Sequence, residues 1–183
     1  FMNQLGYAKA IQKQIRRINN VLTANIRVLE IGADVGLLIR ALSKYLGTSM
    51  ARYDSVEPNI LVHNRLKETI VNTSEAGTIY QTTQSWLDSA KKGRTRYNVA
   101  VLIHVLDHAI NPLDLIRCIS SRLDQNGFIY IVVHDPNSLL ARVLGRRWPA
   151  YCAQHPQLFT RGGLEALAYR CNLECTNFGN TYN

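Results

Sequence analysis

Short apolar runs alternate with helical patterns along most of the chain. Apolar residues recur at helical spacing over residues 8–22, with Lys and Arg between them, which predicts an amphipathic helix. A β-branched run over 27–31 predicts a buried strand. A helical pattern over 37–46 follows, and Gly47 is placed to end that helix.

The alternation continues to the end of the sequence. Further strands are predicted over 51–57, 78–81, 98–104, 128–134 and 173–178, and further helices over 61–70, 85–92, 112–123, 139–144 and 164–169. The runs NVAVLIH (98–104) and FIYIVVH (128–134) are almost continuously apolar, as in strands buried on both faces. The pattern predicts one α/β domain over residues 1–183, with a Rossmann-like, doubly wound, mostly parallel sheet and helices on both faces. Residues 1–24 form its N-terminal helical segment.

The turn between the first strand and its helix reads RVLEIGADVGLL, and Glu57 ends the next strand 25 residues after Gly32. Ligands of such sheets bind beyond the carboxyl ends of the strands. Gly32 and Gly36 allow a tight turn, and the Glu57 carboxylate can accept two hydrogen bonds from a ribose diol. An ordinary turn and a solvent-facing strand end are the plainer interpretations, but the combination favours a nucleoside-containing cofactor.

Asp34 stands where a dinucleotide-binding turn has its second glycine. Its charge would repel a pyrophosphate at the helix N-terminus, which argues against NAD. S-adenosylmethionine carries a sulfonium and an ammonium group instead of phosphates, so Glu30 and Asp34 suit it electrostatically. Aspartate also tolerates the left-handed backbone that a glycine would have served.

Composition and charge limit the partners and the location that we expect for this protein. The chain has 183 residues and a net charge of +8, from 21 Lys and Arg against 13 Asp and Glu. This charge favours contact with polyanions, but the basic residues are spread out, so nucleic acid is not the expected partner. No apolar stretch is long enough to span a membrane, and the beginning of the chain does not resemble a signal peptide. The four cysteines are predicted to be free thiols in a reducing cytoplasm, and no metal site is predicted.

Several segments resemble, in order, those of class I S-adenosylmethionine-dependent methyltransferases. They are VLEIGADVG, SVEPN, YNVAVLIHVLDHAINPLDLI, NGFIYIVVHDPNSLLARVLGRRW and HPQLFTRGGLEAL. The chain is most similar to the small-molecule group known as methyltransferase 23, which includes ubiquinone-biosynthesis-like enzymes. The resemblance covers residues 25–178, and it implies methyl transfer from S-adenosylmethionine to a small acceptor, with S-adenosylhomocysteine as product.

The resemblance also implies residue roles. The residues expected to bind the cofactor are Glu30, Gly32, Ala33, Asp34, Gly36, Glu57, Pro58, Asn59, Ser85, Trp86, His104 and Val105. Of these, Glu30, Gly32, Ala33 and Gly36 would line the methionine half. Glu57 would bind the ribose, Pro58 and Asn59 would lie beside the adenine, and Ser85 with Trp86 would cover its edge. Three histidines are candidates for a base, because an imidazole titrates near neutral pH: His108, His134 and His155.

The sequence departs from the family pattern at three places. Asp34 replaces a glycine, Asp107 stands where glutamate is commoner, and His134-Asp135 replaces Pro-Asn. The sheet of this family typically has seven strands, whereas the sequence predicts six. The expected total is therefore six to seven, and the seventh strand is either absent or lost by truncation. An exposed sheet edge would then be available for a homodimer.

Two other functions stay open at this point. The positive charge motivates a nucleic-acid methyltransferase, although the segment after 98–104 lacks the N-P-P-Y-type pattern of base-amino methyltransferases. The altered turn motivates a non-catalytic methyltransferase-like binding domain. For an enzyme, the acceptor atom is expected to be oxygen, and the step an in-line displacement.

Overall fold

The computed structural model describes residues 2–19, 25–73, 76–93 and 95–179. The chain divides into two compact units, which are described separately. The first holds the described residues up to 101 and residues 122–130. The second holds residues 102–121 and the described residues from 131 onward.

The first unit is built on a sheet with the strand order β3-β2-β1-β4-β5. Its elements are α1 (Met2–Asn19), β1 (Ile26–Ile31), α2 (Leu37–Leu46), β2 (Met50–Val56), α3 (His63–Val71), β3 (Ile79–Tyr80), α4 (Thr83–Gly93), β4 (Tyr97–Ile103) and β5 (Leu123–Val132). The last residues of β4 and β5 run into the second unit. β1 pairs in parallel with β2, and β2 with β3. The order reverses between β1 and β4, as in doubly wound sheets, so the predicted fold class is confirmed.

The described sheet has five strands, so the prediction of six to seven was too high. Residues 173–178 form no strand, and the prediction there was wrong. Leu173 and Cys175 alternate with polar residues, which is why a strand was predicted, but both stay only half-buried. Phe178 is 40% exposed, and the guanidinium of Arg161 lies over its ring. The predicted homodimer stays a prediction.

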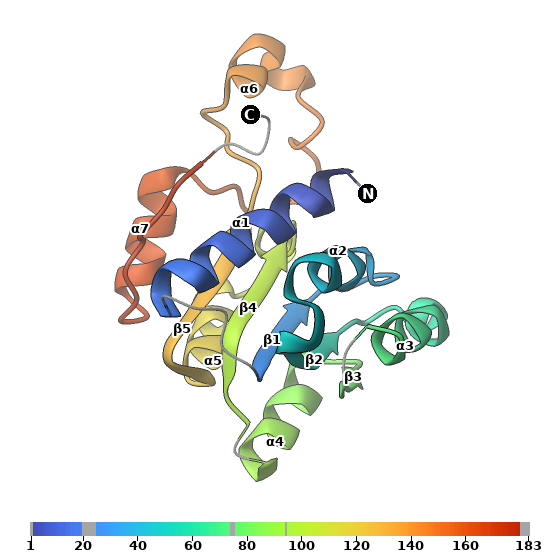
Figure 1. The fold of residues 1–183 in the computed structure, drawn as a ribbon. Helices are drawn as coiled ribbons and strands as arrows, with labels where there is room; N and C mark the ends of the chain where they lie inside the picture. The colour runs from blue at the N-terminus through green and yellow to red at the C-terminus, as the bar shows by residue number, and fades with distance from the viewer. Residues whose placement is uncertain (1, 20–24, 74–75, 94, 180–183) are drawn as a thin grey trace. The chain divides into compact units, whose positions relative to one another are not determined.

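Helices α1 and α2 lie side by side over one face of the sheet (Figure 1). Ile11 and Ile15 of α1 are buried, and the ring of Tyr7 lies 6.3 Å from that of Tyr130 on β5. The helix begins at Met2, six residues earlier than predicted, and residues 20–22 of the prediction lie outside the described part of the chain.

β4 and β5, which were predicted from the two nearly continuous apolar runs, differ in burial. Residues 99–102 of β4 are fully buried, as predicted for a strand covered on both faces. β5 is longer than predicted and mostly half-buried, because it is an edge strand of the described sheet. A continuous apolar run therefore does not by itself distinguish a central strand from an edge strand.

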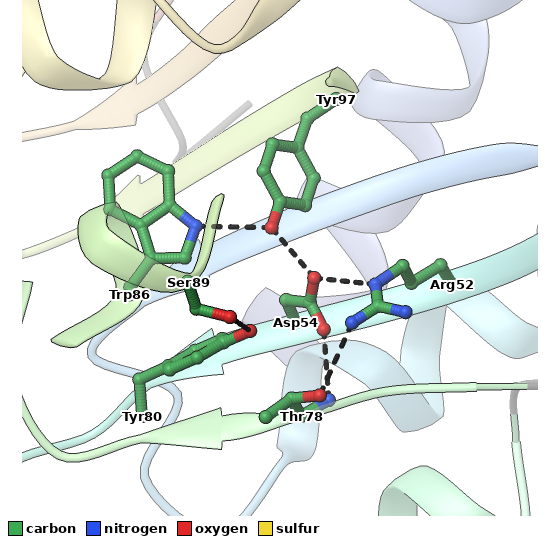
Figure 2. Close-up of polar contacts among 7 residues, drawn as sticks. All are labelled: Arg52, Asp54, Thr78, Tyr80, Trp86, Ser89 and Tyr97. Carbon is green, nitrogen blue, oxygen red and sulfur yellow. Dashed lines mark hydrogen bonds and ion pairs between the residues drawn. The ribbon is translucent and has the colours of Figure 1, made fainter. Parts of the chain in front are cut away.

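A polar network around the buried Asp54 joins β2, α4, β4 and the residue that precedes β3 in the first unit (Figure 2). Asp54 is 1% exposed, and its Oδ2 accepts hydrogen bonds from Arg52 Nε and Tyr97 Oη, both at 2.7 Å. Its Oδ1 accepts from the backbone N–H of Thr78 at 2.9 Å. Trp86 Nε1 donates to Tyr97 Oη at 3.1 Å. Burial, reinforced by the charge of Asp54, raises the pKa of Tyr97 far above its usual range, so this hydroxyl stays a donor.

The second unit consists of short helices joined by irregular chain. Its elements are α5 (Pro112–Ser120), α6 (Leu139–Leu144), α7 (Arg161–Tyr169) and two 3₁₀ turns, η3 (Leu106–His108) and η4 (Gly145–Arg147). α5 begins as predicted, with Pro112 in its first turn and Asn111 Oδ1 accepting from the N–H of Asp114 at 3.2 Å. A small apolar cluster forms around Trp148, with Ala141, Ala150 and Leu158.

Candidate functional site

The turn after β1 has the backbone that its sequence predicts. Gly32 (φ 75°) and Gly36 (φ 79°) both adopt positive φ. Asp34 does so too (φ 46°), which confirms that this aspartate takes a conformation usually left to glycine. The N–H of Gly32 donates to Val56 O at 2.8 Å, so the turn stays joined to the end of β2.

Glu57, which follows β2, joins the same turn through its side chain. Its Oε2 accepts from the N–H of Asp34 and its Oε1 from the N–H of Asn59, both at 2.8 Å. The residue is 7% exposed. A carboxylate offers about four lone-pair sites, and these two bonds leave acceptor capacity for a diol.

Glu30 lies at the end of β1 and is 4% exposed. Its Oε2 accepts a hydrogen bond from Tyr53 Oη on β2. Burial raises the pKa of Glu30 to about 8, and the negative charges of Glu57 and Asp34 add to the shift. The three carboxyl groups therefore interact electrostatically, and a cation bound among them would relieve their repulsion.

The other predicted cofactor residues of this unit have mixed surroundings. A Cβ on Gly36 would lie 3.0 Å from Leu66 and 3.1 Å from Thr69, so this glycine is needed for packing against α3 whether or not a ligand binds. Ala33 is buried, whereas Pro58 and Asn59 are exposed, and Asn59 Oδ1 accepts from the N–H of Leu61 at 3.1 Å.

Residues 85 and 86 were predicted together but lie in different environments. Ser85 is exposed and bonds to Thr82 at the start of α4. Trp86 is fully buried, and its indole N–H is taken by Tyr97. We therefore place Trp86 in the core rather than against the adenine. Of these two residues, Ser85 alone stays a predicted cofactor-site residue.

The second unit brings four histidines together: His104, His108, His134 and His155. We call them the histidine cluster. The ring centroids of His104 and His134 are 4.6 Å apart, those of His134 and His155 are 4.7 Å apart, and those of His108 and His155 are 4.6 Å apart. His104 directly follows β4 with φ 52°, and Val105 continues into the turn at 106–108. Non-glycine residues in this conformation are uncommon and concentrate at functional sites.

Asp107 lies beside this cluster and is fully buried. Its Oδ2 accepts from the backbone N–H of His134 at 3.2 Å and lies 2.9 Å from His134 Nδ1. Its Oδ1 is buried and has no hydrogen-bond partner among the described residues. Partial desolvation of the ring, followed by the charge of His134, lowers the pKa of His104. The sequence singled out Asp107 only as a departure from the family, although its spacing from His104 was a signal that the two could meet.

The remaining two rings are oriented by backbone carbonyls. His108 Nδ1 lies 2.7 Å from Gln154 O, and His155 Nδ1 lies 2.9 Å from Ala150 O. A carbonyl only accepts, so both Nδ1 atoms carry the proton and both Nε2 atoms keep a lone pair in the neutral ring. Both rings therefore have the tautomer of a base whose accepting atom is Nε2.

None of the helices described above is long and apolar enough to cross a membrane.

The model of the methyltransferase domain family matches residues 4–177, so this chain belongs to that family. No curated protein matches it by sequence comparison. Among solved structures, it is similar to the plantazolicin methyltransferase BpumL in complex with SAH, with a TM-score of 0.70 and 17% sequence identity. That match covers 92% of this chain and 62% of BpumL, so the chain spans less than two thirds of that relative's length.

A second similar structure is the magnesium protoporphyrin IX methyltransferase from Synechocystis PCC 6803 with bound SAH. Its TM-score is 0.66 at 12% identity, and the match covers 97% of this chain and 77% of that one. At these identities the matches show the shared methyltransferase fold.

Proposed function

We propose that this chain is an S-adenosylmethionine-dependent methyltransferase acting on a small-molecule acceptor through an oxygen atom. The observation that carries the proposal is the acidic turn of the first unit. There Glu57 is tied to the N–H of Asp34 while keeping lone pairs free. The family to which the chain belongs, and the SAH named in both similar structures, support the same cofactor.

The residues of the turn suit this cofactor in shape and charge. Glu57 would accept hydrogen bonds from the ribose hydroxyls, with Pro58 and Asn59 beside it. Gly32, Ala33, Asp34 and Gly36 would line the methionine half, where the charge of Asp34 favours a cation and a bound cation would in turn favour ionisation of Glu30. When bound, S-adenosylmethionine supplies a methyl group on a sulfonium that leaves as a neutral thioether. The protein is then required mainly to align the acceptor, which can contribute roughly 7–11 kcal/mol to the reduction of the barrier.

A hydroxyl acceptor would lose a proton during transfer, and the histidine cluster could take it. His108 and His155 fit this role best, because each keeps its Nε2 lone pair while its Nδ1 faces a backbone carbonyl. His134 was the third predicted base, but its Nδ1 is held by Asp107. We therefore assign His108 and His155 to proton acceptance, with His104 and Val105 beside the transferred methyl.

The test is calorimetric titration with S-adenosylmethionine and S-adenosylhomocysteine. We expect wild type to bind both, and Glu57→Ala to weaken binding at least tenfold, which corresponds to about 1.4 kcal/mol. Glu68→Ala is the matched control, because this glutamate is exposed on α3. Glu57→Gln keeps one carbonyl acceptor and guards against a folding defect in the alanine variant. A folded wild type that binds neither compound would overturn the proposal.

A further inference from the structure

We propose that His104, Asp107 and His134 form a binding site for a divalent transition-metal ion such as Zn²⁺. All three belong to the second unit, and each offers one donor atom within 4.8 Å of the others. The sequence alone predicted no metal at these positions. The inference depends on their arrangement, and it does not depend on the proposed methyl transfer.

The unpartnered oxygen of Asp107 is the first independent argument. A buried acceptor without a partner costs about 1–3 kcal/mol, so native proteins rarely keep one without a reason. Asp107 is fully buried, and its Oδ1 has no hydrogen-bond partner in the described part of the chain. A cation held by this carboxylate would compensate for that burial.

The donor set is the second argument. Two imidazoles and one carboxylate form a set that zinc and other late first-row metals favour, whereas Mg²⁺ and Ca²⁺ prefer oxygen donors alone. A metal ligand must be a neutral imidazole, and each of the two histidines offers one ring nitrogen to the group. Three protein ligands leave at least one coordination position open, which is typical of catalytic rather than structural zinc sites.

The three side chains would need to move only a little to coordinate one metal ion. Ligand atoms around tetrahedral zinc lie about 3.3 Å apart, given bonds of about 2.0–2.1 Å. His134 Nδ1 and Asp107 Oδ2 are already 2.9 Å apart. The His104 side chain is exposed, so its ring can turn toward the other two without disturbing the core. The ion would replace the proton in the contact between His134 Nδ1 and Asp107 Oδ2.

The experiment titrates the purified full chain with Zn²⁺ by calorimetry and, separately, with Co²⁺ by visible absorption. Wild type is expected to bind one equivalent of Zn²⁺ and to give Co²⁺ ligand-field bands stronger than those of the aqueous ion. Asp107→Asn and His104→Gln should each weaken Zn²⁺ binding at least tenfold. His63→Ala is the matched control, because His63 is the one histidine outside the cluster and should leave binding unchanged.

Two outcomes would overturn the assignment. Equal Zn²⁺ affinity in wild type and Asp107→Asn would mean adventitious binding elsewhere. Loss of binding in Cys152→Ser, with Asp107→Asn unaffected, would place the ion at Cys152 and His155, whose Sγ and Nδ1 lie 3.5 Å apart. Thermal unfolding of each variant confirms that it is folded. Because the readout is metal binding, failure here leaves the S-adenosylmethionine titration unaffected.

Discussion

Asp54 and Asp107 are both buried aspartates, one in each compact unit, and their oxygens are used differently. Asp54 accepts from Arg52, Tyr97 and Thr78, so both of its oxygens have partners. Among the residues that the structure describes, Asp107 accepts only from His134, through one oxygen. A buried carboxylate with donors on both oxygens stabilises the fold, whereas the unpartnered oxygen of Asp107, beside imidazoles, is the basis of the metal site proposed above.

Asp54→Ala should give the largest effect. It removes the acceptor of Tyr97 Oη, of Thr78 N–H and of the half-buried Arg52 guanidinium, and leaves the buried Tyr97 hydroxyl without its acceptor. We expect a loss of about 3 kcal/mol in the free energy of unfolding, measured by urea denaturation.

Tyr97→Phe is the matched control for this variant, because it removes only the two bonds of Tyr97 Oη, to Asp54 and from Trp86, and should cost about 2 kcal/mol. If Asp54→Ala were no worse than Tyr97→Phe, the network would not be the structural element that the comparison makes it.

Glu30 is a third buried carboxyl and extends the comparison to pH. Its pKa is about 8 in the folded chain, against 4.5 for an ordinary glutamate. The folded state therefore binds the extra proton between these values, and stability should fall as pH rises from about 5 to 8. The slope from this one group is at most about 1.4 kcal/mol per pH unit.

Urea denaturation at several pH values measures this slope. Glu30→Gln, which cannot ionise, should remove most of it while keeping a hydrogen-bonding partner for Tyr53. A Gln variant whose stability follows that of wild type across the whole range would show that Glu30 is ionised throughout.

Asp107→Asn should have the smallest effect on stability, a change below about 1 kcal/mol. The amide oxygen can still accept from the His134 N–H. The variant loses the carboxylate's bond to the His134 ring, but it also no longer buries a charge that lacks a full set of partners. Thermal and urea unfolding check this value. A loss as large as that of Asp54→Ala would show that Asp107 is a structural residue, and would remove the contrast between the two regions.

Local sequence signals predicted the features that depend on local physics. The turn with Asp34 at positive φ, the cap and proline that open α5, and the limits of α6 all follow from residues within a few positions of one another. The central strands followed from apolar content, because a strand covered on both faces needs apolar side chains throughout.

The features that the sequence missed depend on distant partners. Trp86 was assigned to the cofactor because of its place after β3, but its surroundings are set by Tyr97 and Asp54 on other strands. Asp107 is recognisable as a site residue only through its contact with His134, which lies 27 residues later in the sequence. No periodicity in a single sequence encodes that meeting.

The contact between Glu30 and Tyr53 has a consequence for how this sequence can drift over evolutionary time. It joins β1 to β2 across 23 positions inside the first unit. Replacing either residue by an apolar one leaves the other polar group buried without its partner, at a cost of about 1–3 kcal/mol, whereas replacing both restores a compatible pair. As far as this buried hydrogen bond is concerned, the two positions are therefore expected to change together, while the role proposed for Glu30 in cofactor binding restricts that exchange further.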